Sequence, residues 1–132
     1  MKEEFLKMNS LEQFSKKKYL NLETFRKSGR SVLTPVWFVQ DGVTIYVQTM
    51  ANSGKVKRIR NNDRVNIAPC KMDGKLIGPW VPAQAREVTD PNVSTTADHL
   101  LDRKYGLLKK IFSNQRASKG AQDIILEIKI SG

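Results

Sequence analysis

The chain has 132 residues, which is enough for one domain with a hydrophobic core, and we expect a single domain over residues 1–132. Its 23 Lys and Arg residues outnumber the 13 Asp and Glu residues, and the net charge of +10 indicates an anionic partner, either a nucleic acid or a charged small molecule. Cys70 is the only cysteine and His99 the only histidine, so the sequence excludes an intrachain disulfide and offers no ligand set for zinc.

The sequence has no pattern typical of a membrane or exported protein. Residues 1–4 carry charge early and lack the apolar core of a signal peptide. The longest apolar run, 32–39, is interrupted by Thr34 and Pro35 and is too short to span a bilayer. We therefore expect a cytoplasmic protein without a membrane partner.

The first predicted element is a short helix from Ser10 to about Lys17, because Ser10 and Gln13 have the spacing of a capping box. We expect Leu11 and Phe14 to dock this helix onto the core. After it the apolar period changes to two, which predicts strands. The expected strands cover residues 19–25, 31–40, 43–48, 64–71, 76–88 and 123–130.

Turn signals separate these strands. Pro35 removes a backbone donor from the second strand, so we expect it at a sheet edge or a bulge. Asp41-Gly42 predicts a hairpin into the third strand. Strands joined by short turns are usually antiparallel, so the sequence predicts a mainly β protein, a six-stranded antiparallel barrel with peripheral helices.

Two further helices are expected. One begins after Asn52 or Ser53 and ends near residues 61–62. The other is capped by Ser94 or Thr95 and extends to about Phe112. Its apolar stripe consists of Leu101, Tyr105, Leu108 and Phe112.

The chain is organised around residues 44–64, where a strand turns into a short basic helix through small polar residues. The first N–H groups of a helix lie at the positive end of its dipole and bind phosphate readily. We interpret residues 48–58 as a phosphate-binding turn, and the alternative is a solvated basic helix with an ordinary cap. The side chains available to bind phosphate are Thr49, Ser53, Lys55, Lys57 and Arg58.

Several motifs occur together in an order typical of one family. They are LTPVWF at 33–38, KRIRNNDRV at 57–65, APC at 68–70 and GPWVPAQAR at 78–86. In this order the chain resembles the pyridoxamine-phosphate-oxidase-like split-barrel family over roughly residues 18–129. Within that family it is most similar to the deazaflavin-dependent (coenzyme F-420) oxidoreductases.

The resemblance implies a six-stranded split barrel that forms a homodimer, with the cofactor bound at the subunit interface. It implies that the turn after the third strand holds the cofactor phosphate, and that the second strand lies along the ring system. The positions that match phosphate contacts are Thr49, Ser53 and Lys55, with Lys57 and Arg58 nearby. Those that match ring contacts are Thr34, Pro35, Val36, Trp37 and Gln48.

Two other residues bear on this resemblance. Trp80 could form a wall of the cofactor or substrate pocket, and packing at the dimer interface is the alternative. Gly54 stands where pyridoxamine-phosphate oxidases carry a second basic residue, and their extended C-terminal substrate region is absent. We therefore do not expect oxidation of a pyridoxamine phosphate.

The expected function is an oxidoreductase that binds coenzyme F-420 or FMN and transfers hydride to or from a small organic substrate. The positive charge favours F-420, whose polyglutamate tail is anionic. One alternative is a non-enzymatic flavin carrier or sensor, which would use the same binding residues. Another is a nucleic-acid-binding barrel, which has less support because the aromatic residues do not cluster with the basic run. The sequence identifies neither a catalytic residue nor a metal site.

Overall fold

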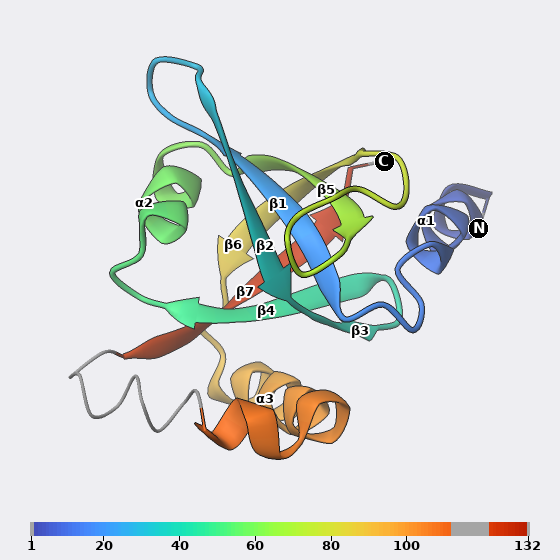
Figure 1. Ribbon diagram of the computed structural model, residues 1–132, viewed down its shortest axis with the longest axis vertical. Helices are drawn as coiled ribbons and strands as arrows, with labels where there is room; N and C mark the ends of the chain where they lie inside the picture. The colour runs from blue at the N-terminus through green and yellow to red at the C-terminus, as the bar shows by residue number, and fades with distance from the viewer. Residues whose placement is uncertain (1, 112–121, 132) are drawn as a thin grey trace.

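One antiparallel sheet of seven strands forms the body of the protein and curls into a half-barrel (Figure 1). The computed structural model describes residues 2–111 and 122–131. The strand order is β2-β1-β5-β6-β7-β4-β3, and every pair of neighbours is antiparallel. The strands are β1 (Tyr19–Phe25), β2 (Ser31–Trp37), β3 (Val39–Asp41), β4 (Thr44–Met50), β5 (Arg64–Cys70), β6 (Val81–Glu87) and β7 (Asp123–Ile130).

This architecture confirms the expected mainly β fold of the split-barrel type. The described sheet has seven strands where six were expected, because the strand predicted over 31–40 is divided at Phe38 into β2 and β3. The Tyr105 hydroxyl accepts a hydrogen bond from the Phe38 N–H at 2.9 Å and lies 2.6 Å from the Phe38 carbonyl oxygen. A side chain therefore satisfies both backbone groups of Phe38, and the ladder is interrupted there.

Pro35 lies in β2, at one edge of the sheet, as expected. It faces Asn21 of β1 in the β1–β2 register. An edge strand tolerates the missing donor because one side of the strand has no neighbour to pair with. The edge position therefore explains why proline is accepted inside a strand.

The N-terminal helix differs from its prediction. Helix α1 covers Lys2–Glu12, so Ser10 lies inside the helix and does not cap it. The residues before Ser10 are strong helix formers, which carry the helix further toward the N-terminus than a cap at Ser10 allows. Lys16 has a φ of 63°, a left-handed conformation that ends the helical path before Lys17. Leu11 and Phe14 are buried in the core, as expected.

Helix α3 also begins earlier than predicted. It covers Pro91–Tyr105, and its N-cap is Asp90, whose carboxylate accepts a hydrogen bond from the Asn92 N–H at 2.9 Å. Proline is favoured at the first position of a helix, so Asp90 is a better cap than the predicted Ser94 or Thr95. The helix stops at Gly106, which has a φ of 59°, and residues 107–111 are helical again. The predicted end at Phe112 lies outside the described residues.

The strand predicted over 76–88 is shorter in the structure. Only β6, Val81–Glu87, pairs as a strand, and residues 71–80 form a loop with one isolated bridge to β5. Gly78 explains part of this, since a Cβ there would lie 2.5 Å from Gln13 Oε1 and 2.7 Å from Pro69 Cγ. The loop therefore packs too closely on β5 to extend the sheet.

The core has two parts. The larger part fills the inside of the curled sheet and includes Phe14, Phe38 and Leu126. The smaller part lies between the sheet and α3 and includes Leu101 and Tyr105. Helix α2 (Gly54–Asn61) contacts β1 and β6, whereas α3 contacts β3 and β7, so the two helices cover different parts of the sheet (Figure 1). Among the described residues, no helix has the length and apolar character needed to cross a bilayer.

We predict that Tyr105→Phe lowers the free energy of unfolding by about 1–3 kcal/mol, because it leaves the buried Phe38 N–H without its partner, whereas the Phe38 carbonyl keeps the Lys104 ammonium. Urea denaturation followed by circular dichroism measures the change. Tyr19→Phe is the control, since the Tyr19 hydroxyl makes no hydrogen bond with the described residues. Equal stability of the two variants would contradict the role given to Tyr105.

Candidate functional site

A cavity of about 620 Å³ opens beside the edge strand β2 and the end of β4. Its volume falls within the range of about 300–1,000 Å³ that is typical of small-molecule sites. Most of its wall is apolar, and Thr49 and Lys55 supply polar groups. The residues that line it are Tyr19, Thr34, Pro35, Val36, Trp37, Gln48, Thr49, Met50, Lys55, Met72, Leu101, Leu108 and Lys109.

The structure brings most of the residues predicted from the sequence together in this cavity. Four come from β2, two from β4 and one from the first turn of α2. In this order they are Thr34, Pro35, Val36 and Trp37, then Gln48 and Thr49, then Lys55. The segments share a wall because β2 and β4 approach one another across the opening of the half-barrel.

The other predicted residues do not line the cavity. Ser53 is the N-cap of α2, and its hydroxyl accepts a hydrogen bond from the Val56 N–H at 3.5 Å. Lys57 is exposed on α2. Trp80 is half-buried in the segment before β6.

The polar end of the cavity lies where β4 turns into α2. Thr49 is 4% exposed, and its hydroxyl accepts a hydrogen bond from the Lys55 ammonium at 2.8 Å. Ser53 fixes the start of the helix as its cap, so the positive end of the helix dipole is beside the same ammonium. The sequence TMANSGK therefore produces a local concentration of positive potential that suits an anion.

The Arg58 side chain reaches from the last turn of α2 back to the start of the helix at Gly54. Its Nη1 is 2.7 Å from the position that a Cβ on Gly54 would occupy, and its Nε donates to the Thr24 hydroxyl at 2.7 Å. Burial, and after it the neighbouring Arg26, lower the pKa of Arg58 below its ordinary value. The guanidinium thus covers the place left open by the missing side chain of Gly54.

Trp37 and Tyr105 form the link between the cavity wall and α3. Their rings are stacked, with centroids 4.5 Å apart and planes inclined by 8°. The Tyr105 hydroxyl also lies 2.7 Å from the carbonyl oxygen of Lys18, just before β1. The position of the Trp37 ring is therefore set by α3 as well as by its own strand.

Sequence reasoning missed several lining residues. Met50 continues the alternation of β4, and Leu101 and Leu108 belong to the predicted apolar stripe of the last helix, so the sequence showed their patterns without linking them to a site. Tyr19 faces Trp37 in the β1–β2 register, which only the strand pairing reveals. Met72 and Lys109 reach the cavity from segments that are distant in sequence, and no local sequence pattern identifies them as lining residues.

Lys109 is a buried lysine at the edge of the cavity, with a side chain that is 9% exposed. Its ammonium donates to the carboxylates of Asp98 at 2.6 Å and Asp102 at 2.9 Å. Burial alone would lower the pKa of Lys109, but these two hydrogen bonds raise it above its ordinary value. Lys109 therefore stays charged and joins residues 107–111 to α3.

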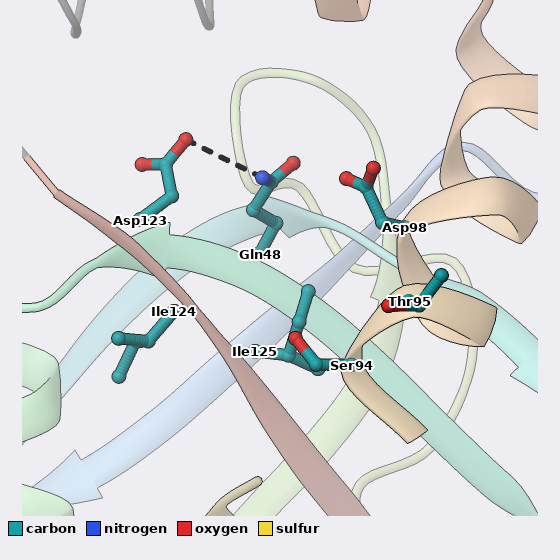
Figure 2. Close-up of a pocket in the computed structure, with 7 residues that line it drawn as sticks. All are labelled: Gln48, Ser94, Thr95, Asp98, Asp123, Ile124 and Ile125. Carbon is teal, nitrogen blue, oxygen red and sulfur yellow. Dashed lines mark hydrogen bonds between the residues drawn. The ribbon is translucent and has the colours of Figure 1, made fainter. Parts of the chain in front are cut away.

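A second, smaller cavity of about 210 Å³ adjoins the first, and Gln48 lines both. It lies between β4, β7 and the start of α3 (Figure 2). Gln48 Nε2 donates to Asp123 Oδ2 at 3.3 Å, and Asp98 faces the same space from α3.

Cys70 and His99 take no part in either cavity. Cys70 is buried in β5, where burial, and after it Asp73, raise the pKa of its thiol, so the thiol is not activated. His99 is exposed on α3. The described residues contain no group of three or more His, Cys, Asp or Glu side chains that could hold a metal ion.

Comparison with known proteins gives one family and a set of similar folds. The family model of pyridoxamine 5'-phosphate oxidase matches residues 7–127. No curated protein sequence matches the chain.

Three solved structures illustrate the fold similarity. The haem storage protein HutZ from Vibrio cholerae has a TM-score of 0.72 and 14% identity, with 94% of this chain and 89% of that chain covered. A FAD-binding protein from Mesorhizobium loti has a TM-score of 0.64 and 17% identity, with 94% and 87% covered. An F420 reductase has a TM-score of 0.59 and 19% identity, with 92% and 93% covered. At these identities the similarity concerns the fold alone.

Lys104 leads to a prediction about pH. Its ammonium lies 3.8 Å from the centroid of the Phe38 ring and donates to the Phe38 carbonyl at 2.8 Å, and burial lowers its pKa from 10.5 to about 8. An unfolded lysine keeps the ordinary value, so between these pH values the unfolded state binds more protons. Lys104 therefore contributes an unfolding free energy that rises with pH from about 8 to 10.5.

Titration of the Lys104 side chain by NMR, with Lys104→Arg to assign its resonance, is expected to give a midpoint near 8. A midpoint at or above 10.5 would show that the ring and the carbonyl outweigh burial.

Proposed function

The chain belongs to the pyridoxamine 5'-phosphate oxidase family, and on this premise we propose that it is an oxidoreductase that binds a flavin-type cofactor in the 620 Å³ cavity. The cofactor is a deazaflavin coenzyme or FMN, and the reaction transfers hydride to or from a small organic substrate. The family match does not itself locate the cofactor, so we assign it to this cavity and to named residues.

One observation carries the proposal: an apolar cavity with a cationic end formed by Lys55, Thr49 and the start of α2. A flavin-type cofactor has the matching shape, a flat ring system joined to a phosphate group. The phosphate would accept hydrogen bonds from Lys55 and Thr49, and the nearby Arg58 would add positive charge. The residues of the site therefore fit the group.

The ring would lie along β2. Pro35 lies on this edge strand and leaves no backbone donor at that point. Trp37 would form one wall of the ring site, held by its stack with Tyr105. Gln48 would meet the ring from the opposite side of the opening.

A bound flavin or deazaflavin supplies hydride chemistry on its own ring. The protein's part is to bind the phosphate, orient the ring and exclude water from one face of it. If the cofactor ring carries the chemistry, the protein needs no catalytic acid–base pair. The described residues that line the cavity contain no such pair.

The net charge of +10 favours the deazaflavin coenzyme, because its polyglutamate tail adds negative charge beyond the phosphate. FMN requires only the local contacts at Lys55 and Thr49. Titration of both cofactors into cofactor-free protein decides between them. Tight binding of FMN without binding of the deazaflavin would overturn the preference for the deazaflavin.

We further propose that the protein is a homodimer with the cavity at the subunit interface. Three apolar side chains that line the cavity are exposed in the single chain, Met50 at 37%, Met72 at 73% and Leu108 at 56%. Apolar surface of this kind is stabilised when another molecule covers it. A second copy would bury these side chains and close the cavity over the cofactor.

Lys55→Ala is predicted to weaken cofactor binding by about 1.5–3 kcal/mol, the range for a hydrogen bond to a charged group, which is about ten- to a hundredfold in Kd. Fluorescence titration measures the affinity, and circular dichroism checks that the fold is intact. Lys57→Ala is the matched control, because it removes the same charge from an exposed position outside the cavity. Equal losses in the two variants would contradict a direct contact by Lys55.

Light scattering is expected to give twice the chain mass of 15.0 kDa. Leu108→Glu should shift the protein toward the monomer and weaken cofactor binding with it, since it places a charge in the apolar contact. Thr96→Glu adds the same charge on the exposed surface of α3 and should leave the mass unchanged. A wild-type monomer at micromolar concentration would refute the dimer.

A further inference from the structure

Three arginine residues meet where the hairpin of β1 and β2 approaches helix α2. Strand β1 pairs with β5 only as far as Glu23, so residues 24–32 form a two-stranded ribbon that projects beyond the rest of the sheet, on the side of α2 (Figure 1). The Arg26 N–H donates to the Arg30 carbonyl at 2.9 Å, so these two residues lie opposite one another at the end of the ribbon. Burial lowers the pKa of Arg58 in α2, and the nearby charge of Arg26 lowers it further.

No carboxylate of the described residues forms an ion pair with Arg26, Arg30 or Arg58, which we call the arginine cluster. Arg58 donates through Nε to the Thr24 hydroxyl at 2.7 Å, and this neutral acceptor holds the guanidinium without balancing its charge. The described carboxylates pair instead with Arg60, Arg86, Lys109 and Lys129. The arginine cluster therefore carries positive charge that no described carboxylate balances.

The arginine cluster is unfavourable for the isolated chain. Like charges directly opposite one another on paired strands destabilise a hairpin, and Arg26 and Arg30 have this arrangement. The Arg58 guanidinium covers Gly54 at the start of α2, where the helix dipole is positive. Local arrangements that lower stability without a compensating contact are typical of functional surfaces. An anion between the ribbon and the helix would relieve both repulsions.

Two exposed lysines extend the positive charge on the same two elements. Lys27 lies in the turn of the hairpin, and Lys57 precedes Arg58 in α2. Together with the arginine cluster they form the basic surface, which consists of Arg26, Lys27, Arg30, Lys57 and Arg58. A single phosphate group carries a charge of about −1.5 to −2, which is too little to balance this surface. The basic surface therefore suits a partner with repeated negative charges.

We propose that the basic surface binds the phosphate backbone of double-stranded DNA without regard to base sequence. Guanidinium groups donate two parallel hydrogen bonds to one phosphate, which suits the three arginines. The net charge of +10 attracts a polyanion at longer range and favours its binding through release of counterions. The proposal does not depend on the cofactor of the larger cavity.

The shape of the ribbon favours duplex DNA over other nucleic acids. The major groove of B-form DNA is about 12 Å wide and admits a two-stranded β-ribbon, whereas the major groove of double-stranded RNA is deep and narrow. Proteins that bind single strands stack the bases on aromatic side chains, and the turn at residues 26–30 contains none. This contact differs from the stacking barrel considered in the sequence analysis, because it uses charge and ribbon shape alone.

The first test uses the unaltered full chain. Fluorescence anisotropy of a labelled DNA duplex of mixed sequence measures binding over a range of salt concentrations. We expect saturable binding with a Kd of about 1–100 µM near physiological salt, and a logarithm of the binding constant that falls linearly with the logarithm of the salt concentration. Double-stranded RNA of the same length and poly-L-glutamate at the same charge concentration are expected to compete at least about tenfold more weakly, because neither offers the wide groove.

Two double variants make a matched pair. One combines Arg26→Gln with Arg30→Gln, and the other combines Lys71→Gln with Lys75→Gln, so each removes two positive charges from exposed positions. Residues 71–75 follow the end of β5 that pairs with the start of β1, roughly 20 Å of strand from the end of the hairpin, which is beyond the screening length of about 10 Å.

The hairpin variant is expected to raise the Kd for DNA about tenfold or more and to lower the salt slope by about two, since each phosphate contact contributes about 0.9. The control variant is expected to keep the Kd within about threefold. The Tm of the hairpin variant should equal or exceed that of the unaltered chain, because like charges have been removed. Its affinity for FMN should stay within about twofold, so this test is separate from that of the proposed function.

Any of four results would overturn the proposal. They are absence of saturable DNA binding, equal competition by RNA or poly-L-glutamate, equal losses of DNA affinity in the two double variants, and a lower Tm in the hairpin variant. The competition experiment needs no substitution, so the proposal stays testable even if the hairpin variant does not fold.

Discussion

The position of α3 on the sheet depends on one hydroxyl group. Tyr105 reaches the gap between β2 and β3 and satisfies both backbone groups of Phe38, while its ring stacks on Trp37. Burial raises the pKa of Tyr105, so the hydroxyl keeps its proton at neutral pH. Together with Lys104, which donates to the Phe38 carbonyl, this hydroxyl fixes α3 at the point where the sheet edge forms a cavity wall, and both cavities take one side from the helix.

The cationic end of the large cavity has a different origin. It is local in sequence, since β4, the cap at Ser53 and the ammonium of Lys55 follow one another within a few residues. The apolar part is assembled from β2, α3 and the loop that carries Met72, which lie far apart along the chain. The proposed anion site therefore depends on the local strand-to-helix junction, whereas the proposed ring site depends on the whole half-barrel.

This difference explains which features could be predicted from the sequence and which could not. The alternation of apolar residues predicted most strands, and the Ser53 cap followed from its own neighbours. The errors arose where competing local signals existed, as at Ser10 and at Asp90, or where a distant side chain decided, as at Phe38. The lining residues that were missed come from segments brought in by strand pairing and helix packing, which no local pattern records.

The contact between Arg58 and Gly54 predicts how these two positions vary among homologous sequences. The guanidinium of Arg58 occupies the volume that a side chain on residue 54 would need, and it is held there by the buried Thr24. Positions 54 and 58 therefore share one volume and one positive charge, and they should change together during divergence. Homologous sequences with a bulky or basic residue at position 54 are expected to carry a shorter residue at position 58.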